Sequence, residues 1–500
     1  MFLLFKKLYR NRLFLVVFFL VSSVTASLGV KASPWIEVGD ERLRNNLQLL
    51  NDSGVMPISL TTWPVMWADV KKSLDKIDRA HLNAAQASAV RELEFELRYQ
   101  TRQSLKRSIE VVAGSSRVMF RDFGAYQREK AELHKSIEWD GDNVAIKVQA
   151  NVVTDPGEDA LQTYFDGSYV AGVLGGNSGE WVLGVGAIDR WWGGGSQSSL
   201  ILSNNARPVP SVMLRTKQSQ SFETPLLSWL GEWQFVSFLG QMESNRAIPE
   251  AKLTGMRFTF KPFDNLEFGL SRAMQWGGEG RSEGFKTFFK SLTSQGENES
   301  GDTGNQLAGF DARFNYVLTE NLNGAFYAQT IGEDEAGYMP SRRTHQLGFD
   351  FSQALGEGDF LKFNLEYTNT TADAFKDVIP NITYEHGVYA NGYRYRGRTL
   401  GASFDSDSEV AAVGAAYQQS GGQLSELSLS YMRLNEDGVA SGNTVSASAQ
   451  SLYVIQANHQ RFFCKGQLKV GVSYQSEVLD ALNDDLDQAS VFASWEYRFK

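Results

Sequence analysis

The feature that most constrains the fold of this chain is a change in its hydrophobic period near residue 108. Before that point apolar residues recur every three or four positions, and after it they alternate with polar residues in segment after segment. Examples of the alternating kind are Leu361/Phe363/Leu365/Tyr367 and Val491/Ala493/Trp495/Tyr497/Phe499. A period of two is typical of strands that are apolar on one face and polar on the other. We therefore predict a large sheet from residue 108 to the C-terminus.

The connections between these segments alternate between short and long. CKG (464–466) and TENL (319–322) are short, whereas 276–304 and 370–407 are long. A transmembrane barrel has short periplasmic turns and long outer loops, and a soluble sandwich has no reason for this alternation. Propellers repeat a blade motif, and we find none. The fold class is predicted as mainly β, a closed antiparallel transmembrane β-barrel of about eighteen strands over residues 108–500. The predicted strands are 108–119, 130–139, 143–152, 166–175, 180–188, 221–229, 231–241, 250–261, 265–275, 305–318, 323–331, 344–353, 360–369, 408–418, 423–434, 449–461, 466–475 and 488–499.

Residues 33–107 are predicted to form a small helical bundle at the periplasmic end of the barrel. Asp40 is a good N-cap for a first helix with Leu43, Leu47 and Leu50 on one face. A second helix is predicted to open at Pro64, and a third to cover 84–107. Each helix has one apolar stripe, so each must dock on something. We expect the bundle to plug the barrel mouth.

Residues 1–32 have the layout of a secretory signal peptide. Four basic residues precede the apolar run 13–21, and cleavage is expected after Ala26 or Ala32, with Ala32 preferred. Losing the five basic residues of 1–32, which hold no acidic residue, changes the formal charge from −10 to −15. That charge argues against a nucleic-acid partner. Export and a strand-built membrane segment together predict a location in the bacterial outer membrane.

The sequence suggests neither a cofactor nor a metal. Cys464 is the single cysteine, so no intrachain disulfide or thiolate cluster can form, and the five histidines lack ligand spacing. The acidic run D-S-D-S-E (405–409) is interpreted as a solvated outer loop rather than a calcium site. No catalytic residue is assigned, although a hydrolase assembled from separate strands remains open.

Several long motifs resemble one family, the Wzi outer-membrane proteins of capsule assembly. They are LTTWP (60–64), RWWGGG (190–195), AIPEAKLTGMRFTFKPF (247–263), RAMQWGGEGR (272–281), GNQLAGFD (304–311) and FYAQTIGEDEAGYMPS (326–341). The likeness runs from about Trp35 to the C-terminus and is densest over 180–345. It implies an eighteen-stranded barrel with a periplasmic helical bundle. It also implies a lectin-like, non-enzymatic protein that attaches capsular or extracellular polysaccharide to the cell.

The expected partners follow from this resemblance: the polysaccharide, outer-membrane lipid and lipopolysaccharide, the barrel-insertion machinery and polysaccharide export proteins. The alternative function is a porin-like channel for sugars or exported polysaccharide. A channel requires an open lumen, whereas a lectin can bind sugar with its lumen plugged.

The candidate glycan-binding residues lie in the predicted outer loops. The segment 389–398 offers tyrosine faces for sugar rings and arginines for acidic groups, although an aromatic girdle explains it equally. For the tryptophans beside glycines, a place in the aromatic girdle is likewise the alternative to glycan binding. The acidic triplet 333–335 is expected to brace the loop against Arg281, Arg342 or Arg343, and the alternatives are polymer binding, cation binding and catalysis. The candidates are Trp191, Trp192, Arg207, Trp276, Arg281, Glu333, Asp334, Glu335, Tyr338, Tyr389, Tyr393, Arg394, Tyr395 and Arg396.

Overall fold

The computed structural model describes residues 34–499, with short gaps. The gaps are 103, 125–126, 142, 155–160, 176–179, 293–303, 337–338, 374–377, 441 and 481–486. The predicted signal peptide therefore lies outside the described residues. Side chains are described for all the remaining residues except 334–336 and 339–340.

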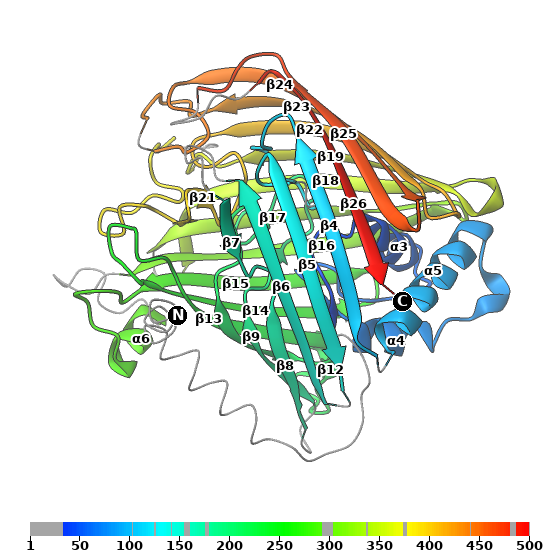
Figure 1. The fold of residues 1–500 in the computed structure, drawn as a ribbon. Helices are drawn as coiled ribbons and strands as arrows, with labels where there is room; N and C mark the ends of the chain where they lie inside the picture. The colour runs from blue at the N-terminus through cyan, green and yellow to red at the C-terminus, as the bar shows by residue number, and fades with distance from the viewer. Residues whose placement is uncertain are drawn as a thin grey trace.

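Eighteen antiparallel strands close into a barrel (Figure 1), which confirms the predicted fold class. Two of the eighteen are interrupted, because β7 and β8 share the partner β6, and β11 and β12 share the partner β13. The last strand pairs with β4 and closes the wall. The wall consists of β4 (Lys106–Gly114), β5 (Ala131–Asp140), β6 (Val144–Thr154), β7 (Leu161–Tyr164), β8 (Tyr169–Leu174), β9 (Trp181–Gly186), β11 (Ser211–Thr216), β12 (Gln220–Ser221), β13 (Glu232–Gln241), β14 (Lys252–Phe263), β15 (Leu266–Trp276), β16 (Asn305–Thr319), β17 (Leu322–Ala336), β18 (Met339–Ala354), β19 (Phe360–Asn369), β22 (Glu409–Gln418), β23 (Leu424–Leu434), β24 (Gln450–Phe463), β25 (Gly466–Gln475) and β26 (Ala489–Phe499).

The two faces of this wall differ as the alternating pattern requires. Outward-facing Leu270 and Phe310, which are paired across β15 and β16, are 52% and 50% exposed. Inward-facing Arg257 and Arg313 are almost fully buried. Apolar side chains that stay exposed on the outside of a closed wall suit a lipid environment. Polar side chains that are buried on the inside show that something fills the lumen.

Three helices cover the end of the barrel where the short turns lie (Figure 1, right). They are α3 (Glu41–Asp52), α4 (Trp67–Leu74) and α5 (Ala84–Gln100). The predicted cap is present, since the Asp40 carboxylate accepts a hydrogen bond from the Leu43 N–H at 3.0 Å. The second helix starts three residues after Pro64, and the third ends seven residues before the predicted limit of 107. Within the described residues, no helix combines the length and apolar composition needed to cross a membrane.

One predicted strand, 221–229, is wrong. The wall strand lies earlier, in β11 and β12, and the chain then makes a turn at the helical end that contains the 3-10 helix η2 (Ser228–Leu230). Leu226 and Trp229 in this turn are 81% and 62% exposed. The apolar residues of 221–229 favour a strand in the sequence, but in the structure they lie at the edge of the lipid-facing wall, where aromatic residues are expected.

The lumen is filled from both ends. From the helical end comes β2 (Thr62–Trp63), and from the opposite end comes the loop 187–210 with β10 (Trp191–Trp192). The two strands pair inside the barrel, with Trp191 opposite Trp63. The wall holds the segment from the helical end. Arg257 binds Asp311 at 2.6 Å and the Thr61 carbonyl at 3.0 Å, and the Glu267 carboxylate accepts the Leu60 N–H at 3.0 Å.

The opposite end of the barrel carries the long loops. They contain the helix α6 (Phe285–Leu292) and the two-residue strands β20 (Arg394–Tyr395) and β21 (Arg398–Thr399) (Figure 1, left). Residues 332–336 and 339–340 of the acidic segment, predicted as a loop, instead continue the paired strands β17 and β18. Two further short strands, β1 (Trp35–Ile36) and β3 (Val65–Met66), pair beside the helices.

Candidate functional site

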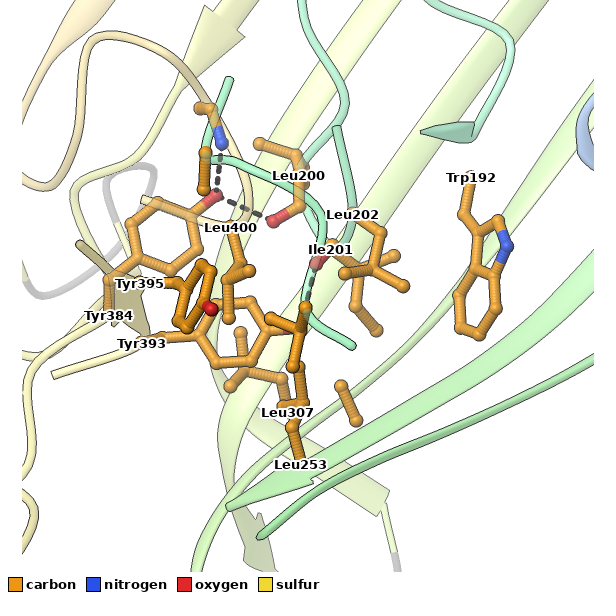
Figure 2. Close-up of a cluster of buried hydrophobic side chains, with 14 of the residues drawn as sticks. Trp192, Leu200, Ile201, Leu202, Leu253, Leu307, Tyr384, Tyr393, Tyr395 and Leu400 are labelled. Carbon is orange, nitrogen blue, oxygen red and sulfur yellow. Dashed lines mark hydrogen bonds between the residues drawn. The ribbon is translucent and has the colours of Figure 1, made fainter. Parts of the chain in front are cut away.

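Four tyrosines of the segment 384–395 close the loop end of the barrel from within. Tyr384 and Tyr393 are fully buried, and their hydroxyls donate to the carbonyls of Leu200 and Ile201 at 2.6 and 3.0 Å (Figure 2). Tyr389 is 1% exposed, and its hydroxyl donates to the Gly277 carbonyl at 3.0 Å. The predicted binding tyrosines Tyr389, Tyr393 and Tyr395 are therefore buried at the loop end and do not face solvent.

Arg394 is also occupied internally. Its guanidinium binds the Asp405 carboxylate with two hydrogen bonds of 2.8 Å and also pairs with Glu385. Asp405 in turn accepts the Thr444 N–H at 2.9 Å, which ties together the loops 370–407 and 435–448. The interpretation of 405–409 as a solvated loop is wrong, because Asp405 and Asp407 are at most 1% exposed. Their carboxylates accept hydrogen bonds from the backbone of neighbouring loop segments and are not exposed to solvent.

The tryptophans lie in two different places, and neither is a free surface. Trp191 and Trp192 belong to β10 inside the lumen, where both are fully buried, so they are not part of an aromatic girdle and do not face solvent in this structure. Trp276 ends β15 and is 6% exposed, with its ring 5.5 Å from that of Phe288 in α6.

Glu333 is the member of the acidic triplet whose side chain the structure describes. The Glu333 carboxylate accepts the N–H of Tyr384 at 2.6 Å and so holds the segment that closes the mouth. Asp334 and Glu335 continue β17 opposite Ser341 and Pro340, and their side chains lie outside the described residues, as does the whole of Tyr338.

Tyr164, Arg207 and Arg396 form what we call the mouth cluster. The guanidinium carbon of Arg207 lies 3.7 Å from the centroid of the Tyr164 ring, and that of Arg396 lies 5.1 Å from it. Arg396 is exposed and Tyr164 is partly exposed, so the cluster reaches solvent at the rim. Arg207 is fixed by Asp166 at 2.8 Å and Glu129 at 3.1 Å.

Both arginines of this cluster remain positively charged. Burial alone would lower the pKa of Arg207, but Asp166 and Glu129 outweigh it and raise that pKa above the ordinary value. The pKa of Arg396 is raised as well, because Tyr395 offsets the effect of burial. A partly exposed aromatic ring beside two permanent cations suits a ligand that has both apolar and acidic groups.

The sequence prediction includes Arg207 and Arg396 but not Tyr164. Its signal is the aromatic pair of TYFDG (163–167), which stands between two alternating segments. Phe165, the second member of the pair, is 60% exposed. Arg281 lies at a separate point of the rim, with its guanidinium carbon 5.5 Å from the centroid of the Tyr389 ring.

Comparison with known proteins identifies the family. The sequence profile of the family "Capsule assembly protein Wzi" matches residues 100–491. The chain belongs to the Wzi family. The barrel wall of this Wzi-family protein is therefore its outer-membrane segment.

Two relatives describe the family further. A solved structure of Wzi from Escherichia coli superposes with a TM-score of 0.81 at 27% identity, covering 94% of this chain and 100% of that chain. It is described as an outer membrane protein involved in group 1 capsule assembly and as a carbohydrate-binding β-barrel. An uncharacterized 55.8 kDa protein of the cps region of Klebsiella pneumoniae is 34% identical over 342 residues, 66% of this chain. The alignment spans 65% of that relative's length.

Proposed function

We propose that this Wzi-family protein attaches capsular or other extracellular polysaccharide to the cell surface, and that the mouth cluster is its contact with the polymer. The observation that carries the proposal is that Arg207 and Arg396 both lie against the partly exposed Tyr164 ring at the rim. Aromatic faces stack on sugar rings, and guanidinium groups bind carboxylates or other acidic substituents. The carbohydrate-binding relative from Escherichia coli supports the ligand class.

The filled lumen supports binding at the surface over passage through the barrel. Trp63 and Trp191 pair across the interior, and the tyrosines of 384–395 cover the loop end. A repeating polymer offers the same groups many times, so weak contacts on many copies of the protein add up to firm attachment. We infer that binding without bond cleavage is sufficient for this role.

The orientation in the membrane follows from loop length. The helices α3, α4 and α5 lie at the end with the short turns, which is the periplasmic side in outer-membrane barrels. This arrangement supports residues 33–107 as a periplasmic bundle and plug, and it points the mouth cluster outward. The partners that go with this function are the barrel-insertion machinery, which folds the wall, and the export proteins that deliver the polymer.

The test measures binding of purified protein to immobilised polysaccharide from the same cell. Losing the aromatic face in Tyr164→Ala, or the exposed cation in Arg396→Ala, should each cost about 1 kcal/mol, or roughly fivefold in affinity. The control is Arg461→Ala, which removes an exposed arginine close to the turn at the helical end.

The same variants are tested in cells. Deleting the gene should release polymer into the medium while its synthesis continues, and Arg461→Ala should restore attachment. Tyr164→Ala combined with Arg396→Ala should restore it poorly. Unchanged cell-attached polymer in the deletion strain would contradict the proposed function. Full attachment by the double variant would contradict only the proposed position of the contact.

A further inference from the structure

The helix α6 packs on the outside of the barrel near its loop end. Leu270, Met274 and Trp276 share the outward parity of β15, yet Leu270 is 52% exposed whereas Met274 and Trp276 are 1% and 6% exposed. The Trp276 ring lies 5.5 Å from that of Phe288, and outward-facing Arg272 donates to the Ser291 carbonyl at 3.4 Å. The helix therefore covers the top of the outward face and lies outside the lumen.

The side of α6 turned away from the wall is amphipathic. Thr287 and Ser291 are buried against the barrel, whereas Phe285 and Phe289 are 79% and 49% exposed. The two rings lie 5.3 Å apart, as i and i+4 neighbours should. At about 100° per residue, Lys286 and Lys290 form a second stripe beside the aromatic one. We call these four residues the α6 face.

The position of the α6 face decides among its possible partners. The exposed pair Leu270 and Phe310 lies on the same outward surface, about 13 Å along the strand from Met274 at the usual strand rise. The aromatic stripe therefore continues the apolar band of the wall at its upper edge. The adjacent lysines suit the phosphate groups that lie at that level in an outer leaflet of anionic lipid.

We propose that α6 is an interfacial helix that docks on the outer leaflet of the membrane, with Phe285 and Phe289 in the acyl boundary and Lys286 and Lys290 on phosphate-bearing lipid headgroups. The helix would fix the height of the loop end above the lipid. This role goes beyond polysaccharide attachment, since it assigns to α6 a ligand of different chemistry from that of the mouth cluster.

The test places a spin label at position 289 by Phe289→Cys, in the full chain with Cys464→Ser to remove the exposed native thiol. The protein is reconstituted in vesicles of phosphatidylglycerol and phosphatidylcholine. Relaxation by oxygen, relative to that by a water-soluble nickel chelate, should be several-fold higher at position 289 than at a control. The control is Phe95→Cys in α5, a phenylalanine that is 65% exposed on a helix at the other end.

Equal ratios at the two positions would place the α6 face in water and overturn the proposal. Strong dipolar coupling between labels on separate molecules would also overturn it, because a second copy would then cover the face. Lys286→Glu with Lys290→Glu should lower the ratio in the mixed vesicles but not in pure phosphatidylcholine, and no change would contradict the headgroup contact. Polysaccharide binding should stay unchanged in all of these variants, so the two proposals fail separately.

Discussion

At the scale of single residues, the side chains best suited to hold sugar are mostly used inside this protein. Tyr393 and Arg394 have the chemistry of a glycan site, but the Tyr393 hydroxyl donates to a backbone carbonyl and the Arg394 guanidinium is taken by Asp405. The same properties, a ring with a polar edge and a planar fork of donors, serve internal closure and ligand binding equally well. The composition of a loop therefore does not show whether its tyrosines and arginines bind a ligand or pack internally. The burial of each side chain distinguishes the two.

A pH dependence of the mouth loops follows from two buried carboxyls. Burial raises the pKa of Asp407 to about 6, helped by Asp437 and Asp405 and opposed by the Asn381 N–H. Burial likewise raises the pKa of Glu385 to about 7, although Arg394 opposes it. Because both values exceed those of the unfolded chain, the folded loops bind more protons. Their stability should fall as the pH rises from about 4 to about 7.

Hydrogen exchange of the segment 378–408, corrected for the intrinsic pH dependence of exchange, measures this effect. Protection should decrease across that window in the wild type. Asp407→Asn combined with Glu385→Gln should flatten the profile, whereas the matched substitution Asp264→Asn in an exposed turn should leave it unchanged. Protection that rises with pH would show that the two carboxyls are ionised throughout the range.

At the scale of elements, the barrel wall could be predicted because each strand has water or protein on one face and lipid on the other. This constraint produces a period of two in every strand, so the number of strands can be counted from the alternating segments. The prediction failed at 221–229, where the exposed residues Leu226 and Trp229 are apolar because they lie at the membrane edge and not because they belong to a strand. The prediction also failed at 332–336 and 339–340, because strands that extend beyond the lipid have no need of apolar residues.

The inward course of the loop 187–210 could not be predicted from sequence, because its partners are distant in the chain. Glu366 of β19 accepts the N–H groups of Ser196 at 2.8 Å and Ser198 at 3.0 Å, as well as the Tyr327 hydroxyl at 2.9 Å. A carboxylate on a wall strand looks like any other inward polar residue in the sequence. Only the closed barrel brings it to the loop.

Glu366→Gln should therefore loosen this loop without opening the wall. The amide presents a donor where backbone N–H groups need an acceptor, and each buried group left unsatisfied costs about 1–3 kcal/mol. Hydrogen exchange at 196–201 should speed up, while exchange in β24 and β25 stays slow. Glu320→Gln in an exposed turn is the control. Unchanged exchange at 196–201 would mean that Glu366 does not hold the loop.

At the scale of the whole molecule, the barrel is filled by segments that enter from both ends. The helices close one end, the loops close the other, and the two plug segments meet between them as β2 and β10. Between plug and wall there remains a polar cavity of about 50 Å³, lined by Glu41, Lys362 and others. That volume holds on the order of four waters. A filled barrel gives the loop end a rigid base, which suits a surface that must hold a polymer under load.

Planar bilayers test this closure directly. Wild-type protein should give no steady ion current, because hydrogen bonds from the wall fix both plug segments. Glu267 holds the segment from the helical end through Leu60 and Thr61, and Glu366 holds the loop from the other end. Glu267→Ala combined with Glu366→Ala removes both acceptors and should produce intermittent openings. Glu320→Ala with Glu223→Ala, an equal change of charge at exposed positions, should stay silent. Steady conductance in the wild type would instead show an open lumen, and the channel function would then replace attachment as the better explanation of the fold.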